Sequence, residues 1–112
     1  MKVAIVSEGN TRDSKVAKVF ARCNCFAIYN MKSSELEYVD NPYIQIKDHA
    51  GEEVARFLAN KGVKRIIGYE FGSKARKTTD QYLIQLVLLG RDHMKVDEVL
   101  KMLESTNINN KI

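Results

Sequence analysis

The chain has 112 residues, 45% of them hydrophobic and 29% charged, a composition typical of one globular domain. No apolar run, the stretch Leu86–Leu89 included, is long enough to cross a bilayer, and the N-terminus lacks the features of a signal peptide, so we expect a cytoplasmic protein without membrane association. The net charge is +4, but 14 acidic residues are mixed among 18 basic ones, so nucleic-acid binding is not expected.

The first residues predict a central strand followed by a short helix. Lys2–Ser7 is a nearly continuous apolar run, which is typical of a strand buried on both faces. Residues 14–22 follow a polar loop and carry apolar side chains at helical spacing, namely Val16, Val19 and Phe20. We therefore expect a helix that ends near residue 22.

A β-hairpin is expected next. Cys25–Asn30 and Leu36–Asp40 are rich in strand-forming residues, and the loop of residues 31–35 is short enough to force them into an antiparallel pair. The second of these strands alternates imperfectly between apolar and polar residues, which indicates an edge strand with one solvated face. Proline at position 42 cannot continue a ladder and ends it.

The remainder of the chain predicts two helix–strand units and a final helix. Gly62 and Gly90 mark element ends, and the apolar residues between positions 96 and 103 give the clearest amphipathic pattern. The expected elements are helix Ala50–Lys61, strand Val63–Tyr69, helix 74–80, buried strand Leu83–Leu89 and a last helix capped by Asp92.

The predicted order is β-α-β-β-α-β-α-β-α. Five strands with helices on both faces make a three-layer α/β/α sandwich around a mixed sheet with one antiparallel hairpin. We expect residues 1–106 to form this single domain and residues 107–112 to be a frayed C-terminal tail.

Both cysteines, Cys23 and Cys25, fall where the predicted helix meets the predicted strand. Their spacing is unfavourable for a disulfide, so free thiols are expected. If the strand has begun at Cys23, the thiols project to one face as candidate ligands of a soft metal or an iron–sulfur species, with Arg22 favouring the thiolate form. Further ligands would have to come from His49, a second subunit or the cofactor. The alternative is that both are small buried hydrophobic residues.

A second kind of site is indicated by His49 and by residues 68–74. His49 precedes a predicted helix and is either a ligand or a solvated loop residue. The segment Gly68–Lys74 lies between a strand and a helix like a phosphate-binding loop, but only three residues separate its glycines and Ser73 precedes the lysine. The helix start at Gly72, Ser73 and Lys74 is therefore either an anion site or a solvated basic face.

A catalytic centre is not expected. RNase H-like nucleases share this element order but need acidic residues in the middle of the first strand, where this chain has Val3–Val6. Neither a Ser/His/Asp triad nor a glycine-rich dinucleotide loop is visible.

Several short motifs follow one another along most of the chain. They are Met1–Gly9, Phe20–Arg22, Phe26–Tyr29, Val39–Pro42, Ala50–Gly51, Asn60–Val63 and Ile66–Gly68 leading to Gly72. In this order, over roughly residues 1–103, the chain resembles the dinitrogenase iron–molybdenum cofactor biosynthesis proteins, also called NifX-like. The resemblance implies a small α/β domain with RNase H-like strand arrangement, which binds iron–sulfur cofactor precursors and passes them between cofactor-assembly proteins without catalysis.

The chain departs from this family pattern at the predicted helix end. Many members carry a histidine and a glycine where this chain has Val19 and Ala21. The first hypothesis is a non-catalytic binding or carrier protein for an iron–sulfur or iron–molybdenum cofactor precursor, with cofactor-assembly proteins as partners. Its cofactor-binding residues would be Arg22, Cys23, Cys25, His49, Gly72, Ser73 and Lys74, with Cys23 and Cys25 as metal ligands. The alternative is a regulatory or interaction module that binds a protein partner or a small anion without metal.

Overall fold

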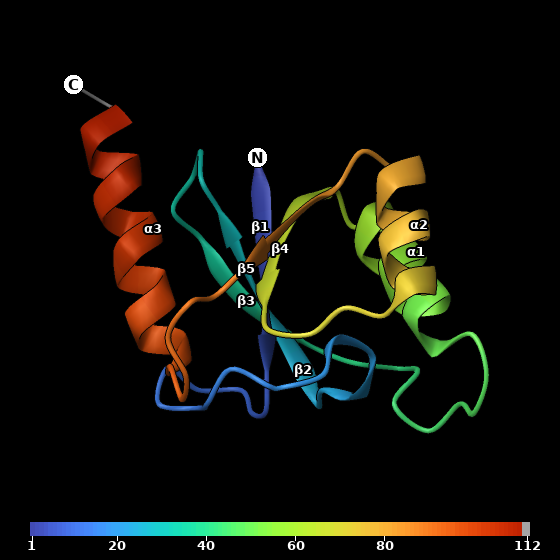
Figure 1. Ribbon diagram of the computed structural model, residues 1–112. Helices are drawn as coiled ribbons and strands as arrows, with labels where there is room; N and C mark the ends of the chain where they lie inside the picture. The colour runs from blue at the N-terminus through green and yellow to red at the C-terminus, as the bar shows by residue number, and fades with distance from the viewer. Residues whose placement is uncertain (111–112) are drawn as a thin grey trace.

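A mixed five-stranded sheet with strand order β3-β2-β1-β4-β5 forms the middle of the computed structural model, which describes residues 1–110 and the side chains of residues 1–106 (Figure 1). β1 is the central strand and pairs antiparallel with β2 and parallel with β4. β2 pairs antiparallel with β3, and β4 pairs parallel with β5. The strands are β1 Lys2–Ser7, β2 Cys25–Asn30, β3 Leu36–Asp40, β4 Val63–Gly68 and β5 Gln85–Leu88.

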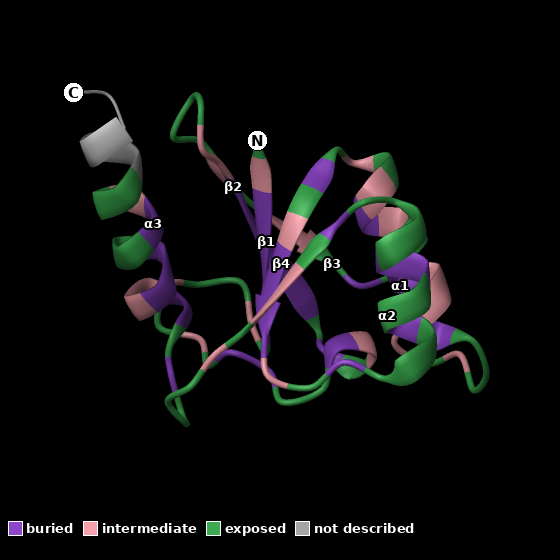
Figure 2. Cartoon of the chain, turned by 45° about the horizontal axis from the view of Figure 1, so that its top comes forward, coloured by how far each residue is buried: buried purple, intermediate pink, exposed green. Residues whose placement is uncertain are grey.

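Helices cover both faces of this sheet (Figure 1). α1 (Ala50–Asn60) and α2 (Ser73–Gln81) lie together on one face, and α3 (Val96–Asn110) lies on the other. Side chains alternate along β1 because successive residues of a strand point to opposite faces: Ala4 and Val6 pack on the α1/α2 side, and Val3 and Ile5 on the α3 side. Figure 2 shows the buried residues concentrated in the central strands and on the sheet-facing sides of the helices.

These observations confirm the predicted three-layer sandwich and its hairpin, in the RNase H-like strand arrangement that the family resemblance implied. The central position of β1 and the edge position of β3 are also confirmed. α1 ends where expected, because Gly62 adopts a left-handed φ of +85° and its N–H donates to Ala59 O.

The helix expected over residues 14–22 is wrong. This segment is extended: Val16 forms an isolated bridge with Ser7, Val19 forms one with Glu70, and only a short 3-10 turn covers Phe20–Arg22. A helix would have placed its apolar residues on one face. Instead Val16 packs into the core on the α3 side while Phe20 packs on the α1/α2 side, so the segment crosses the end of the sheet and seals both layers.

The strand expected over Leu83–Leu89 is shorter and less buried than predicted. β5 lies at the sheet edge, and its residues are half-buried or exposed. It begins only at Gln85, because a turn follows the end of α2 at Gln81 and includes Leu83, which is 84% exposed at φ 57°. Asp92 does not cap α3, which begins at Val96. α3 runs to Asn110, inside the segment expected to fray, and residues 111–112 lie outside the described chain.

Candidate functional site

The carboxyl ends of β1, β3, β4 and β5 meet at one edge of the sheet, because these strands all run in the same direction. Open α/β sheets bind ligands at this edge. A cleft of about 360 Å³, which we call the α1/α2 cleft, opens there between the short 3-10 turn and the starts of α1 and α2. Its walls are Val19, Phe20, Ala21, Arg22, Lys47, His49, Ala50, Gly51, Glu70, Gly72, Ser73, Lys74 and Ala75.

Two helix N-termini converge on this cleft. α1 starts after His49 and α2 after Gly72, and within the described residues neither helix start receives a side-chain capping hydrogen bond. A Cβ added at Gly51 would lie 3.0 Å from the Cβ of Ala75, so the first turns of the two helices are in direct contact. The first N–H groups of a helix have no partner inside it and carry the positive end of its dipole. Two such ends therefore aim at one volume.

Three permanent cations border the same volume. Arg22, Lys47 and Lys74 are all exposed, and among the residues that the structure describes none of the three forms an ion pair. Glu70 supplies the acidic group of the wall, and His49 lies 3.2 Å from Glu52 through its Nδ1 atom. The balance of charge in the cleft is positive, and it favours an anion.

Arg22 also holds one wall in place. Its guanidinium donates to the carbonyl oxygens of Ile44 at 3.2 Å, Ile46 at 2.5 Å and Lys47 at 3.3 Å. This fixes the loop that carries Lys47 and His49 against the 3-10 turn.

The buried Asn41 secures the beginning of the same loop. Its Nδ2 atom donates to Ala21 O at 3.1 Å and to Cys23 O at 2.9 Å, and its Oδ1 atom accepts from the Tyr43 N–H at 2.9 Å. Sequence reasoning used residue 42 as a strand terminator and missed this positioning role of its neighbour. The polar side chain directly before proline was the available signal.

The predicted site residues divide into two groups. Arg22, His49, Gly72, Ser73 and Lys74 all line the α1/α2 cleft, although they come from three separate segments. Cys23 and Cys25 are not among the lining residues. Sequence reasoning did not identify Lys47 and Glu70 as wall residues. Val19, which stands where many family members carry a histidine, does line the cleft and is 44% exposed.

Both thiols are buried, each with 2% of its surface exposed. Cys23 packs in the core on the α1/α2 side, and this burial raises the pKa of its thiol to about 12. Burial also raises the pKa of Cys25, whose Sγ donates to Gly9 O at 2.7 Å. The strand begins only at Cys25, which by alternation shares the α3 side with Ala27, so the two thiols do not face the same way.

The thiolate assignment stays a prediction that this geometry does not favour, because metal ligation requires the deprotonated form. In addition, the described part of the chain contains no group of three or more His, Cys, Asp or Glu side chains arranged to hold a metal ion. The groups that the α1/α2 cleft presents to a ligand are its cationic side chains and the first N–H groups of α1 and α2.

A second cleft of about 620 Å³ lies on the other side of Glu70. Its walls combine acidic and basic groups, including Glu8, Lys15, Lys18 and Asp92. The opposite charges offset one another, and neither α1 nor α2 starts there. The α1/α2 cleft is the better anion site.

The chain is thus a small α/β domain with an open cleft, bordered by cations and by two helix N-termini, at the carboxyl edge of its sheet. Residues 1–106 match the model of the dinitrogenase iron–molybdenum cofactor family, and the chain belongs to that family. This confirms the resemblance seen in the sequence motifs. No curated protein matches the chain, and in the described residues no helix has both the length and the apolar character to cross a membrane.

Solved structures share the fold. The apo form of the orange protein from Desulfovibrio gigas is 24% identical with a TM-score of 0.81, over 95% of this chain and 88% of that one. A Thermotoga protein of the DUF35 family is 28% identical with a TM-score of 0.79, over 95% of this chain and 89% of that one.

Proposed function

We propose that the α1/α2 cleft binds an anionic metal–sulfur cluster as cargo, and that the protein carries an iron–sulfur or iron–molybdenum cofactor precursor between cofactor-assembly proteins. The observation that carries this proposal is the convergence of two uncapped helix N-termini with Arg22, Lys47 and Lys74 on one volume. Family membership supports the class of cargo. The proposal assigns the protein no catalytic step.

The walls favour a large anion of low charge density over a small, strongly hydrated one. Val19, Phe20, Ala21, Ala50 and Ala75 make much of the lining apolar, and an apolar wall cannot replace the water shell of a compact anion such as phosphate. A metal–sulfur cluster spreads its charge over many polarisable atoms. It can rest on the apolar wall while backbone N–H groups and peripheral cations balance its charge.

Non-covalent retention suits a carrier, because cargo held without ligand bonds can be passed on without exchange of thiolates. In this scheme Lys47 and Lys74 balance the charge of the cluster, and Arg22 contributes charge while fixing the loop before α1. Cys23 and Cys25 remain in the fold as buried thiols.

Reconstitution without oxygen tests the proposal. The purified protein would be supplied with iron and sulfide, desalted, and assayed for retained iron, sulfide and visible absorption. We expect Lys47→Gln/Lys74→Gln to weaken retention about tenfold or more for each cation removed. The matched control Lys32→Gln/Lys64→Gln removes two exposed cations distant from the cleft and should retain cargo like the unchanged protein.

The two cysteines provide the discriminating variant. Cys23→Ala/Cys25→Ala should keep the cargo if the cleft holds it, and should lose it if the thiolates are ligands. Loss of absorption in this folded double variant, with full retention in the Lys47→Gln/Lys74→Gln protein, would refute the cleft assignment.

The uncapped helix starts also support a second candidate, the binding of a small anion without metal. Phosphate would then raise the midpoint of thermal unfolding in proportion to RT ln(1 + [L]/Kd). We expect no shift with phosphate, and a shift that disappears in Lys47→Gln/Lys74→Gln would favour the metal-free function.

A further inference from the structure

The strand β5 is an edge of the sheet that carries neither a charged residue nor proline. The segment Tyr82–Leu89 contains no charged residue, and the side chain of Leu88 is 51% exposed. Proteins usually protect edge strands from pairing with charges, proline or a covering element. The opposite edge, β3, follows this rule with exposed Glu37 and Asp40. β5 lacks the protection that β3 has.

The hydrogen-bonding groups on the open side of β5 belong to alternate residues. The Leu89 N–H donates to Gly68 O at 2.9 Å, and Leu88 is the register partner of Gly68. In a parallel pair, the N–H and C=O groups of one residue point to the same side and alternate along the strand. Val87 and Leu89 therefore bond to β4, while Leu86 and Leu88 direct both groups away from the sheet.

We infer that this edge pairs with β5 of a second copy of the chain, antiparallel and about a two-fold axis at Val87. Leu86 then lies opposite Leu88 of the second copy, and each of these two pairs exchanges two hydrogen bonds. The half-exposed Leu88 packs on Leu86 of the second copy, on the face that carries α1 and α2. The two sheets become one continuous sheet.

Two features of the segment Tyr82–Leu89 favour a second copy of the chain as the partner that pairs with this edge. Its outward groups are placed symmetrically around Val87, so an antiparallel copy presents each donor to an acceptor. The strand is uncharged in a chain of net charge +4, so pairing brings no like charges together at the seam. Self-pairing of β3 would instead bring Glu37 and Asp40 of the two copies close to each other.

This inference is independent of the proposed function. None of the residues of Tyr82–Leu89 lines the α1/α2 cleft, so variants of β5 leave the cleft unchanged. A monomeric β5 variant can still be assayed for cargo, and failure of one proposal does not imply failure of the other.

Site-specific cross-linking tests the predicted axis. At the axis, the two copies of residue 87 form a non-hydrogen-bonded pair with Cα atoms about 4.5 Å apart, within the range for a disulfide. Val87→Cys should therefore oxidise to a covalent dimer. Gln85→Cys is the matched control, because the two copies of residue 85 lie about four residues apart along the seam, or roughly 13 Å. Equal cross-linking of both variants, or none with Val87→Cys, would overturn the inference.

Light scattering tests the association without a covalent bond. The unchanged protein should approach twice its chain mass of 12.8 kDa as its concentration rises. Leu88→Lys, which places like charges at the seam, should remain monomeric, whereas Glu37→Gln changes the charge of the other edge equally and should dimerise. A protein that stays monomeric at high concentration, or a Leu88→Lys protein that still dimerises, contradicts the model.

Discussion

The three helices begin at the same edge of the sheet, yet their N-termini have different partners. The first N–H groups of α3 are occupied: Val96 donates to Ser14 O and Asp97 to Arg12 O, each at 2.8 Å. The starts of α1 and α2 have no side-chain cap in the described chain and open into the cleft. The positive end of α3 thus stabilises the fold, whereas those of α1 and α2 are free for a ligand.

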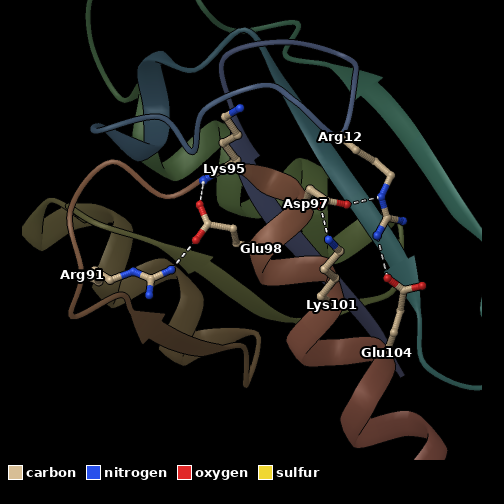
Figure 3. A network of polar contacts seen from close by, with 7 residues as sticks. All are labelled: Arg12, Arg91, Lys95, Asp97, Glu98, Lys101 and Glu104. Atoms are coloured by element: carbon tan, nitrogen blue, oxygen red, sulfur yellow. Dashed lines mark hydrogen bonds and ion pairs between the residues drawn. The ribbon is translucent and has the colours of Figure 1, made fainter.

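The cations divide in the same way. Around α3, Arg12 pairs with Asp97 and with Glu104, each at 2.7 Å, and Lys101 pairs with Asp97 at 3.0 Å (Figure 3). A fourth pair, Arg91 with Glu98, joins the preceding loop to the helix (Figure 3). The cations at the α1/α2 cleft have no such partners among the described residues. The charged groups around α3 thus pair with one another, whereas the cations beside the starts of α1 and α2 have no ion-pair partner in the described chain.

The largest expected effect comes from forcing the two open helix starts apart. Gly51→Val places methyl groups against Ala75, where even a Cβ would lie 3.0 Å away, and should destabilise the protein by about 1–3 kcal/mol. Gly90→Val is the matched control, because no atom lies within 4 Å of the added Cβ. Urea unfolding measures both. Equal stability of the two variants would show that the helix starts are not in contact.

A smaller loss of stability should distinguish the paired cations around α3 from the unpaired cations at the α1/α2 cleft. Arg12→Gln breaks two ion pairs and should cost about 1 kcal/mol of unfolding free energy, since the pairs are partly exposed but form a network. Lys74→Gln breaks none and should leave stability unchanged while it weakens cargo retention. Thermal unfolding in low and high salt checks this. Equal losses of stability in Arg12→Gln and Lys74→Gln would show that the cations around α3 and those at the α1/α2 cleft do not differ in this way.

The pH dependence of the α3 network gives a third test. The hydrogen bond from Arg12 lowers the pKa of Asp97, so this carboxylate stabilises the fold above the ordinary Asp pKa, and its contribution is lost as pH falls through the lowered value. The stability difference between the unchanged protein and Asp97→Asn should therefore shrink on acidification. Urea unfolding across the acidic range measures it, and a constant difference would contradict the pairing.

The smallest expected effect concerns the two cysteines, which should not react with an alkylating reagent in the folded protein. Because burial raises the pKa of Cys23 to about 12, its thiol stays protonated at neutral pH, and iodoacetamide should not modify the folded protein at Cys23 or Cys25. Both should react in urea. For Cys23 the raised pKa favours the fold below its ordinary value near 9.0, and that contribution is lost as pH rises toward 12. Rapid labelling of the native protein, measured by mass spectrometry, would reopen the thiolate hypothesis.

The local sequence pattern predicted the elements whose apolar residues follow the regular spacing of a strand or a helix. The Lys2–Ser7 strand, the hairpin and the helix ending before Gly62 all followed from periodicity and turn residues. Periodicity gave the wrong prediction for residues 14–22, because Val16 packs in the core on the α3 side of the sheet and Phe20 in the core on the α1/α2 side. The tertiary bonds that hold this segment, such as Val16 N–H to Met94 O at 2.9 Å, have no signal in local sequence.

The candidate site was predicted in part for a similar reason. His49 and Gly72–Lys74 each precede or open a helix, so their meeting at the carboxyl edge follows from the α/β topology. Lys47 reaches the cleft only because Arg22 and the buried Asn41 fold its loop back, and no spacing rule encodes those contacts. The sequence indicated the cysteines as candidate ligands because thiols are reactive, but in the structure both are buried in the core.

Anomalous diffraction at the iron edge, from crystals of the reconstituted protein, tests the cargo site most directly. The iron peaks should lie between the N-termini of α1 and α2, beside Arg22, Lys47 and Lys74. Peaks within bonding distance of the Sγ atoms of Cys23 or Cys25, with none in the α1/α2 cleft, would contradict the proposed function.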